Sequence, residues 1–376
     1  MSVERVSELL RERLRRRQPP GDGRVHAEAA MRWLYAAQDS SDDRGVAYGY
    51  WLGKRWMRSY PETTGYIIPT LLNWARLYGE KEAEERAMAM AEWELDGQLD
   101  SGAVPNLTDA EPTVFDTGQV IFGWVAAYRH GSDPRYLDAA RRGARWLISE
   151  LDDEGIWRHA SDAGGPGRVY NVRAAWAMLE LSRAAEDPGL ADAMRPFLDW
   201  TLSEERSDGW FDRNCLTQDA TPLLHTIAYT ARGQLESGLI LGEQRYVDAA
   251  RRTARQLVPK LRHDGFLPGR FDRAWKPTVG WACLTGMAQT SIVWRRLAGL
   301  DPADAELFRG AAARVEDFLM RTQDRSAKHP GLRGGIRGSY PVNGQYGQWR
   351  VLNWATKFFV DSMMLAANDD ALFYRG

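Results

Sequence analysis

The chain has 376 residues and a mass of 42.5 kDa; 44% of its residues are hydrophobic and 27% are charged. These values are typical of a globular protein and exclude a disordered chain or a collagen-like fibre. The net charge of -2 gives no general attraction to nucleic acid, so we expect no nucleic-acid partner. The two cysteines, Cys215 and Cys283, cannot build a disulfide framework and lack the spacing of a zinc site. We therefore expect a cytoplasmic protein that uses no metal and no other cofactor.

Residues 1–24 are predicted to form a charged N-terminal helix or extension, and residues 25–376 a single domain. The N-terminal segment lacks the continuous apolar stretch of a secretory signal. Its clustered arginines could form a phosphate or membrane patch, but glutamates share the helix, and such mixed charge favours a solvated face. These side chains are Arg11, Arg13, Arg15, Arg16 and Arg17, with Glu4, Glu8 and Glu12. No membrane span is predicted. The uncharged run at residues 277–294 is long enough to be considered, but it contains too many polar residues.

A loop of acidic or polar residues, followed by glycine and then an aromatic or apolar residue, recurs along the rest of the chain. Copies include LDDEGIW, RSDGWF and RHDGFLPG. The repeat glycines are Gly45, Gly102, Gly155, Gly209, Gly265 and Gly334, at intervals of 57, 53, 54, 56 and 69 residues. This spacing predicts six units, each long enough for two helices and two short connections.

The segment before each loop is predicted to form an amphipathic outer helix. In residues 136–151 and 246–261, for example, apolar residues recur at helical spacing opposite charged residues. The segment after each loop has far fewer charges and is apolar around most of a helix, which predicts a buried inner helix. These inner helices are expected at residues 61–75, 115–128, 170–182, 223–238, 283–294 and 352–365. Six such hairpins predict an all-α (α/α)6 toroid with an inner ring of helices inside an outer ring.

The inner helices carry polar side chains at equivalent places near their starts. These are Glu62, Asp116 with Gln119, Asn171 with Arg173, His225 with Tyr229, Thr285 with Gln289, and Asn353 with Lys357. In a toroid the six helix starts converge on one pole, where free N–H groups and helix dipoles add to these side chains. We therefore expect a concave, aromatic pocket with a few convergent polar groups at that pole.

Several segments, with the aspartate–glycine–aromatic loops, resemble the six-hairpin (α/α)6-toroid proteins. They are SYPETTGYIIPTLLNWA, FDTGQVIFGW, LLHTIAYTARG, CLTGMAQTSIVW and GGIRGSYPVNGQYGQWRVLNWATKFF. The resemblance covers nearly the whole chain from residue 25, and is strongest to bacterial proteins found with exopolysaccharide-biosynthesis genes. Such toroids include unsaturated glucuronyl hydrolases, polysaccharide lyases, the helical domain of glucuronyl epimerases, and terpene cyclases with protein prenyltransferases. The resemblance implies the architecture and leaves the chemistry open among these classes.

Glu62 and Asp116 are the two carboxylates expected at the inner pole, on adjacent hairpins. Glycoside hydrolysis needs such a pair, one to protonate the leaving oxygen and one to activate water or attack carbon. Each could instead cap its helix, as carboxylates at helix starts often do. Their position at the same pole strengthens the catalytic interpretation of the pair and leaves capping as the alternative.

Asn171, Arg173, His225 and Tyr229 form a second candidate set. In uronate lyases and epimerases a neutral His or Tyr removes the proton next to a carboxylate, while Asn or Arg neutralises that carboxylate. His225 could equally be a structural residue at a helix start. A cytoplasmic location counts against a polymer lyase, because long acidic polymers mostly lie outside the cell.

Aromatic side chains on or beside the loops could stack on sugar rings. Tyr60 precedes an inner helix, and Tyr340, Tyr346 and Trp349 belong to a glycine-rich loop that is expected to cover the pole. Cationic Arg173, Arg337 and Lys357 would suit an acidic sugar, although each could belong to a structural ion pair. Together with Gln119, Asn171, Gln289 and Asn353, these residues are the predicted substrate-binding set.

The sequence thus predicts a carbohydrate-active enzyme, a glycosidase for a short acidic glycan or an exopolysaccharide intermediate. A uronate lyase or C5-epimerase is the first alternative, and a non-catalytic glycan-binding toroid is the second. A terpene cyclase or prenyltransferase is the third, although its DxDD, DDxxD or zinc-ligand motifs are missing from the sequence. The expected partner is an oligosaccharide or polysaccharide.

Overall fold

The computed structural model describes residues 3–17, 19–108, 111–159, 167–216 and 221–376. Its first helices are α1 (Val3–Arg15), α2 (Gly23–Gln38), α3 (Pro61–Tyr78), α4 (Lys81–Gly97), α5 (Val114–Gly131) and α6 (Pro134–Ser149). The chain continues with α7 (Val172–Ala185), α8 (Pro188–Ser203), α9 (Leu224–Leu241), α10 (Gln244–Leu257), α11 (Leu284–Ala298), α12 (Pro302–Thr322) and α13 (Asn353–Ala367). Two short 3-10 helices, η1 (Val169–Asn171) and η2 (Val258–Lys260), complete the helical elements of the described residues.

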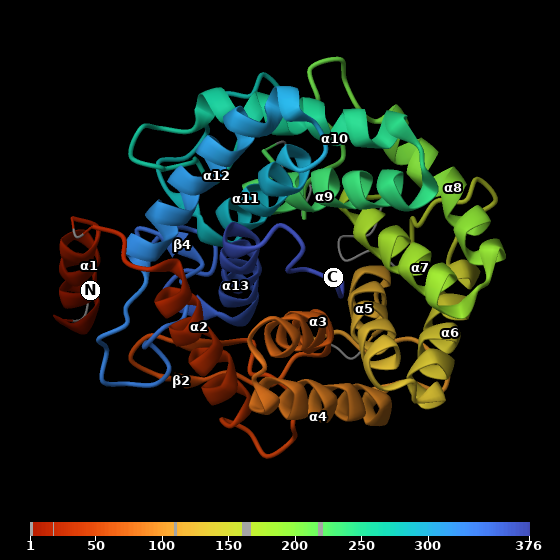
Figure 1. The fold of residues 1–376 in the computed structure, drawn as a ribbon, viewed down its shortest axis with the longest axis horizontal. Coiled ribbons are helices and arrows are strands. Elements are labelled where there is room, and N and C mark those ends of the chain that lie inside the picture. The colour runs from red at the N-terminus through yellow and green to blue at the C-terminus, as the bar shows by residue number, and fades with distance from the viewer. Residues whose placement is uncertain (1–2, 18, 109–110, 160–166, 217–220) are drawn as a thin grey trace.

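From α2 onward the helices alternate between an outer and an inner ring (Figure 1). The inner helices α3, α5, α7, α9, α11 and α13 each pack against the next, and α13 also packs against α3. Each outer helix from α4 to α12 packs on the inner helix that precedes it, whereas α2 packs on α13. Elements from opposite ends of the sequence therefore close the ring, and the predicted all-α (α/α)6 toroid is confirmed.

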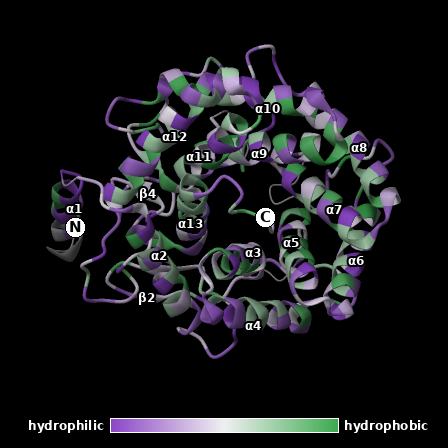
Figure 2. Ribbon diagram, in the orientation of Figure 1, coloured by the Kyte–Doolittle hydropathy of each residue, from purple (hydrophilic) through white to green (hydrophobic). Residues whose placement is uncertain are grey.

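The two rings differ in burial as their sequences predict. Every residue of α5 from Val114 to Ala127 is buried, because this inner helix has neighbours on all sides. The outer helix α10 buries only one stripe, and Figure 2 shows hydrophilic residues along the outside of the ring. Outer helices α6, α8 and α12 each begin with an aspartate–proline pair, in which the aspartate accepts a hydrogen bond from a backbone N–H two residues later.

Glycines let the inner helices approach one another closely. A Cβ atom on Gly65 of α3 would lie 2.6 Å from the Cα of Val120 on α5. A Cβ on Gly286 of α11 would lie 2.6 Å from the backbone nitrogen of His225 on α9. These contacts are shorter than carbon packing allows, so the ring geometry requires glycine at both positions.

Short strands tie the loops before the inner helices together. Strand β1 (Gly49–Trp51) pairs antiparallel with β2 (Arg55–Trp56) and with β5 (Arg350–Leu352), so that Tyr50 lies opposite Trp56 and Val351. Strand β3 (Ala282–Cys283) pairs antiparallel with β4 (Ser339–Tyr340). The glycine-rich loop before α13 is therefore fixed to the first and the fifth inner-helix loops.

The C-terminal residues fill the end of the ring opposite the loops that precede the inner helices. Gly376 lies near the centre of the ring (Figure 1). The side-chain amide of Asn73 donates to the Tyr374 carbonyl at 2.6 Å and accepts from the Tyr374 N–H at 2.8 Å. Lys357 donates to the Gly376 carbonyl at 2.9 Å, and Arg375 forms an ion pair with buried Glu236 at 3.0 Å. The segment after α13 thus closes the pole formed by the C-terminal ends of the inner helices.

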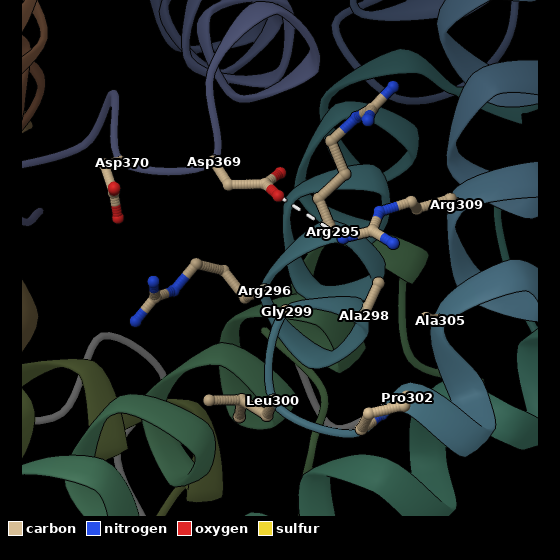
Figure 3. A pocket seen from close by; sticks show the side chains of 10 residues that line it. All are labelled: Arg295, Arg296, Ala298, Gly299, Leu300, Pro302, Ala305, Arg309, Asp369 and Asp370. Carbon is tan, nitrogen blue, oxygen red and sulfur yellow. Dashed lines mark hydrogen bonds and ion pairs between the residues drawn. The ribbon is translucent and has the colours of Figure 1, made fainter.

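Two hollows adjoin this closed pole. One has a volume of about 520 Å³ and lies between Arg295, Arg309 and Asp369 (Figure 3). The other has a volume of about 560 Å³ and shares Arg296, Asp369 and Asp370 with the first. Most of these charged groups pair within the protein, as Arg309 does with Asp369 and Arg296 with Glu236. Among the described helices, none is long and apolar enough to cross a bilayer.

Candidate active site

The starts of α3 and α5 bring the two predicted carboxylates to the same pole. Tyr60, the residue before α3, donates its hydroxyl to Asp116 Oδ2 at 3.0 Å. Asp116 lies in the first turn of α5 and is buried, whereas Glu62, in the first turn of α3, is half-buried. Burial raises the pKa values of Tyr66, Tyr229 and Tyr346, and the negative charge of Glu62 adds to each of these shifts. Glu62 therefore faces the tyrosines at the centre of the ring.

Arg173 occupies the centre of this pole. Its Nε donates to Gln119 Oε1 at 2.9 Å, and its guanidinium lies 4.6 Å from the centroid of the Tyr229 ring. The side chain is only 1% exposed, and Nη2 has no hydrogen-bond partner among the described residues. Burial lowers the pKa of Arg173, while the charge of Glu62 acts in the opposite direction. The guanidinium remains cationic at neutral pH, because its ordinary pKa is far above neutrality.

His225 and Tyr229 lie one turn apart on α9, with their ring centroids 4.3 Å apart and the ring planes tilted by 48°. Gln289 of α11 lies with Nε2 3.0 Å from His225 Nδ1, and it also hydrogen-bonds to Tyr229. Burial, together with the charge of Arg173, lowers the pKa of His225 to about 3. The imidazole is therefore neutral over the physiological range.

Tyr346 brings the glycine-rich loop into the same cluster. Its ring lies 5.4 Å from that of His225, and its hydroxyl accepts a hydrogen bond from Trp354 Nε1 at 2.9 Å. Asn353 Nδ2, at the start of α13, donates to Thr63 Oγ1 on α3 at 2.8 Å. All six inner helices thus contribute to one polar and aromatic pole.

Buried polar atoms without a hydrogen-bond partner among the described residues collect around this cluster. They are both amide atoms of Asn171, Arg173 Nη2, Thr285 Oγ1, Gln289 Oε1 and Asn353 Oδ1. Buried polar groups are normally satisfied by protein, water or ligand, because leaving them unpaired is costly. These donors and acceptors lie at the starts of three inner helices, α7, α11 and α13, and match the chemistry of a polyhydroxylated molecule.

Three predicted substrate-binding residues make their principal contacts elsewhere. Arg337 forms an ion pair with Glu8 of α1 and donates to the Thr322 carbonyl at 3.1 Å. The Tyr340 ring packs against Phe318 on α12. Trp349 is buried, and its carbonyl accepts from the Leu52 N–H. The structure does not bring these three into the cluster around Arg173.

Lys357 lies deeper in the ring than Asn353, on the same helix. It forms an ion pair with Asp361 at 2.8 Å and holds the C-terminal segment. Burial lowers the pKa of Lys357 to about 8, while Asp361 acts in the opposite direction. Its contacts with Asp361 and Gly376 therefore stabilise the closed, C-terminal end of the ring.

Three residues of this pole were not predicted from the sequence. Tyr66 lies one turn after Glu62 on α3 and hydrogen-bonds to Tyr229. The one-turn spacing that pairs His225 with Tyr229 also pairs Glu62 with Tyr66, so the sequence carried a signal for this residue. Trp354 follows Asn353 directly and holds Tyr346. Glu94 of the outer helix α4 is also buried; burial raises its pKa, and the charge of Asp116 raises it further. No inner-helix pattern could reveal Glu94, because it approaches from the outer ring.

Searches of solved structures show the same fold in carbohydrate-active enzymes. An unsaturated glucuronyl hydrolase specific for heparin superposes with a TM-score of 0.74 at 16% identity, over 93% of this chain and 98% of that one. An unsaturated glucuronyl hydrolase from Bacillus sp. GL1, responsible for glycosaminoglycan degradation, gives 0.72 at 17%, over 94% and 100%. Cellobiose 2-epimerase from Bacillus thermoamylovorans gives 0.70 at 13%, over 88% and 95%.

These similarities identify the chain as a six-hairpin (α/α)6 toroid, which is the fold of those hydrolases and of the epimerase. No protein-family model matches the sequence, and no curated protein is similar to it. Among the described residues, no group of three or more His, Cys, Asp and Glu side chains is arranged to hold a metal ion.

Proposed function

We propose that the protein is a glycosidase that acts on a short acidic glycan at the pole formed by the inner-helix starts. One observation carries this proposal. The Nη2 atom of the buried Arg173 guanidinium has no hydrogen-bond partner among the described residues. The guanidinium is also close enough to Glu62 for the charge of Glu62 to affect its pKa. A buried guanidinium is costly unless a carboxylate or a similar group pairs with it. The carboxylate of a uronate would supply that pair.

Glu62 and Asp116 would divide the acid and base roles. In hydrolysis, one carboxyl group gives its proton to the glycosidic oxygen as the bond to the anomeric carbon breaks. The other carboxylate removes a proton from water as the water oxygen bonds to that carbon, or attacks the carbon itself. Tyr60 orients Asp116 through its hydrogen bond, which supports a positioned catalytic group.

The environment of His225 disfavours proton abstraction as the main reaction. With a pKa of about 3, the imidazole is a weak base at neutral pH. Its Nδ1 also faces the Gln289 amide, which leaves the other ring nitrogen to carry the proton when Gln289 donates. Burial raises the pKa of Tyr229, so its phenolate is costly to form. These features support hydrolysis over the lyase and epimerase alternatives.

The substrate that we propose is an intermediate of exopolysaccharide metabolism in the cytoplasm. The resemblance to proteins found with exopolysaccharide-biosynthesis genes supports this choice of pathway. Sugar hydroxyls or ring faces would be bound by the polar and aromatic side chains that surround Arg173 and the two carboxylates. These side chains are Tyr60, Gln119, Asn171, Gln289, Tyr346 and Asn353.

Matched oligosaccharides that end in a uronate, or in its neutral methyl ester, test the proposal. We expect new reducing ends from the uronate and at least about 100-fold slower hydrolysis of the ester, since a charge-assisted Arg pair is lost. Arg173→Met should abolish that preference, whereas Arg145→Met, on the exposed surface of α6, should keep it.

Two further readouts separate the alternatives. A product with the ultraviolet absorbance of an unsaturated uronate would identify elimination, and solvent deuterium in an uncleaved sugar would identify epimerisation. Either result would contradict hydrolysis. Binding without turnover of every oligosaccharide would instead identify a glycan-binding toroid.

A further inference from the structure

The charged residues of helix α1 lie on two faces, one buried against the protein and one exposed. Glu8 and Glu12 are 5% and 1% exposed and point toward the body of the protein. Glu8 forms ion pairs with Arg337 and, at 2.7 Å, with Arg15, while Glu12 Oε2 accepts from the Val342 N–H at 3.0 Å. The mixed-charge, solvated face expected from the sequence is therefore wrong for these glutamates, because both are buried in the docking contact.

Two arginines also belong to the docking face. Arg15 forms an ion pair with Asp324 at 2.7 Å, and Arg16, just after the helix, forms one with Asp264 at 2.7 Å. The Arg16 guanidinium lies 4.4 Å from the centroid of the Phe318 ring on α12. These contacts hold α1 against α12 and β4, at the outer edge of the ring (Figure 1).

The opposite face of α1 is apolar and basic. Leu14 and Leu10 are 61% and 56% exposed, the two highest values among the exposed large hydrophobic side chains of the described residues. Exposed Arg13 shares their stripe, since positions 10, 13 and 14 follow helical spacing, and exposed Arg17 lies in the turn just after the helix. Arg11 is exposed at its border, and residues 8–17 present no exposed acid.

We propose that this face, made by Leu10, Arg11, Arg13, Leu14 and Arg17, binds the surface of an anionic phospholipid bilayer. A helix with leucines and arginines on one convex face can lie in the interface plane. The leucines would enter the acyl boundary while the arginines reach the phosphate and carboxylate headgroups. Because the whole chain has a net charge of -2, the attraction is local to this face.

The exposed leucines favour a lipid surface over an acidic protein as the binding partner of this face. A fluid bilayer accepts isolated leucines without a preformed groove, whereas a protein partner would need a complementary pocket for each of them. The proposal does not depend on the glycosidase assignment, because no residue of this face belongs to the inner pole.

Sedimentation of the full chain with vesicles tests the proposal. The vesicles contain equal parts phosphatidylcholine and phosphatidylserine, and phosphatidylcholine vesicles serve as the neutral comparison. We expect binding only to the anionic vesicles, and its loss in high salt, because screening shortens the range of the attraction.

Two double variants separate the contributions. Arg13→Glu with Arg17→Glu should lower the partition coefficient at least about 25-fold, and Leu10→Ser with Leu14→Ser at least about tenfold. Leu307→Ser removes a leucine that is 47% exposed on α12, and should bind as the parent protein does. Circular dichroism should show all of these variants folded, since their side chains are exposed.

Failure of the parent protein to bind anionic vesicles would overturn the proposal. Unchanged binding in both double variants would also overturn it. Capture by immobilised polyglutamate without vesicle binding would replace lipid with an acidic protein as the occupant.

Discussion

Glu12 makes the docking of α1 dependent on pH. Burial raises the pKa of this carboxyl group to about 7, against an ordinary value of 4.5, although Arg337 and Arg15 oppose the shift. The docked helix therefore holds the proton more tightly than the released helix does. The contribution of Glu12 to docking is greatest below pH 4.5 and is lost as the pH rises through about 7. The difference between the two pKa values corresponds to about 3 kcal/mol of docking free energy.

Glu12→Gln isolates this effect. The amide oxygen can still accept from the Val342 N–H, but the side chain cannot ionise. We expect docking that is stronger by less than about 1 kcal/mol at pH 5 and by up to about 3 kcal/mol at pH 8. Hydrogen exchange of the α1 amides, compared with the parent protein at each pH, measures the difference.

The matched control is Glu306→Gln, which neutralises an exposed acid on α12. It should leave α1 exchange unchanged at both pH values. If Glu12→Gln exchanges as fast as the parent at pH 8, or faster, the buried carboxyl does not oppose docking and the reasoning fails.

Three further predictions concern the ring itself. The His225 imidazole should show no NMR titration between pH 5 and pH 8, because its pKa is about 3; a midpoint near its ordinary value would contradict the buried, neutral ring. Asn73→Ala should lower the free energy of unfolding by about 2 kcal/mol in urea titration, since Tyr374 loses two backbone hydrogen bonds; an unchanged midpoint would argue against the clamp. Gly65→Ala should destabilise the fold by about 1–3 kcal/mol because its Cβ would meet Val120, whereas Gly310→Ala on α12, where a Cβ has open space, should not.

The repeat made the architecture predictable from the sequence. Six similar loops fixed the number of hairpins, and helical periodicity separated outer from inner helices. Equivalent register then placed Glu62, Asp116, Arg173 and His225 at helix starts that share one pole. Because these relations are local or repeated, they need no knowledge of long-range packing.

Contacts that involve non-repeated segments could not be predicted in the same way. Arg337 looked suited to an acidic sugar, yet its carboxylate partner is Glu8, at the other end of the chain. Lys357 is held by Asp361 and by the C-terminal segment, which carries no helical or loop repeat. The buried side of α1 was likewise hidden, because charge alone does not tell which glutamates meet a docking surface.

Turnover by Glu62→Gln and Asp116→Asn, on whichever oligosaccharide the parent protein cleaves, tests the central claim most directly. Each variant should lower kcat at least about 100-fold, as expected for a general acid or base, with a nearly unchanged melting temperature. Glu82→Gln, in the first turn of the outer helix α4, should remain fully active. If both inner variants stay active while His225→Ala or Tyr229→Phe abolishes turnover, the carboxylates are not the catalytic pair and proton abstraction by the α9 residues replaces the glycosidase assignment.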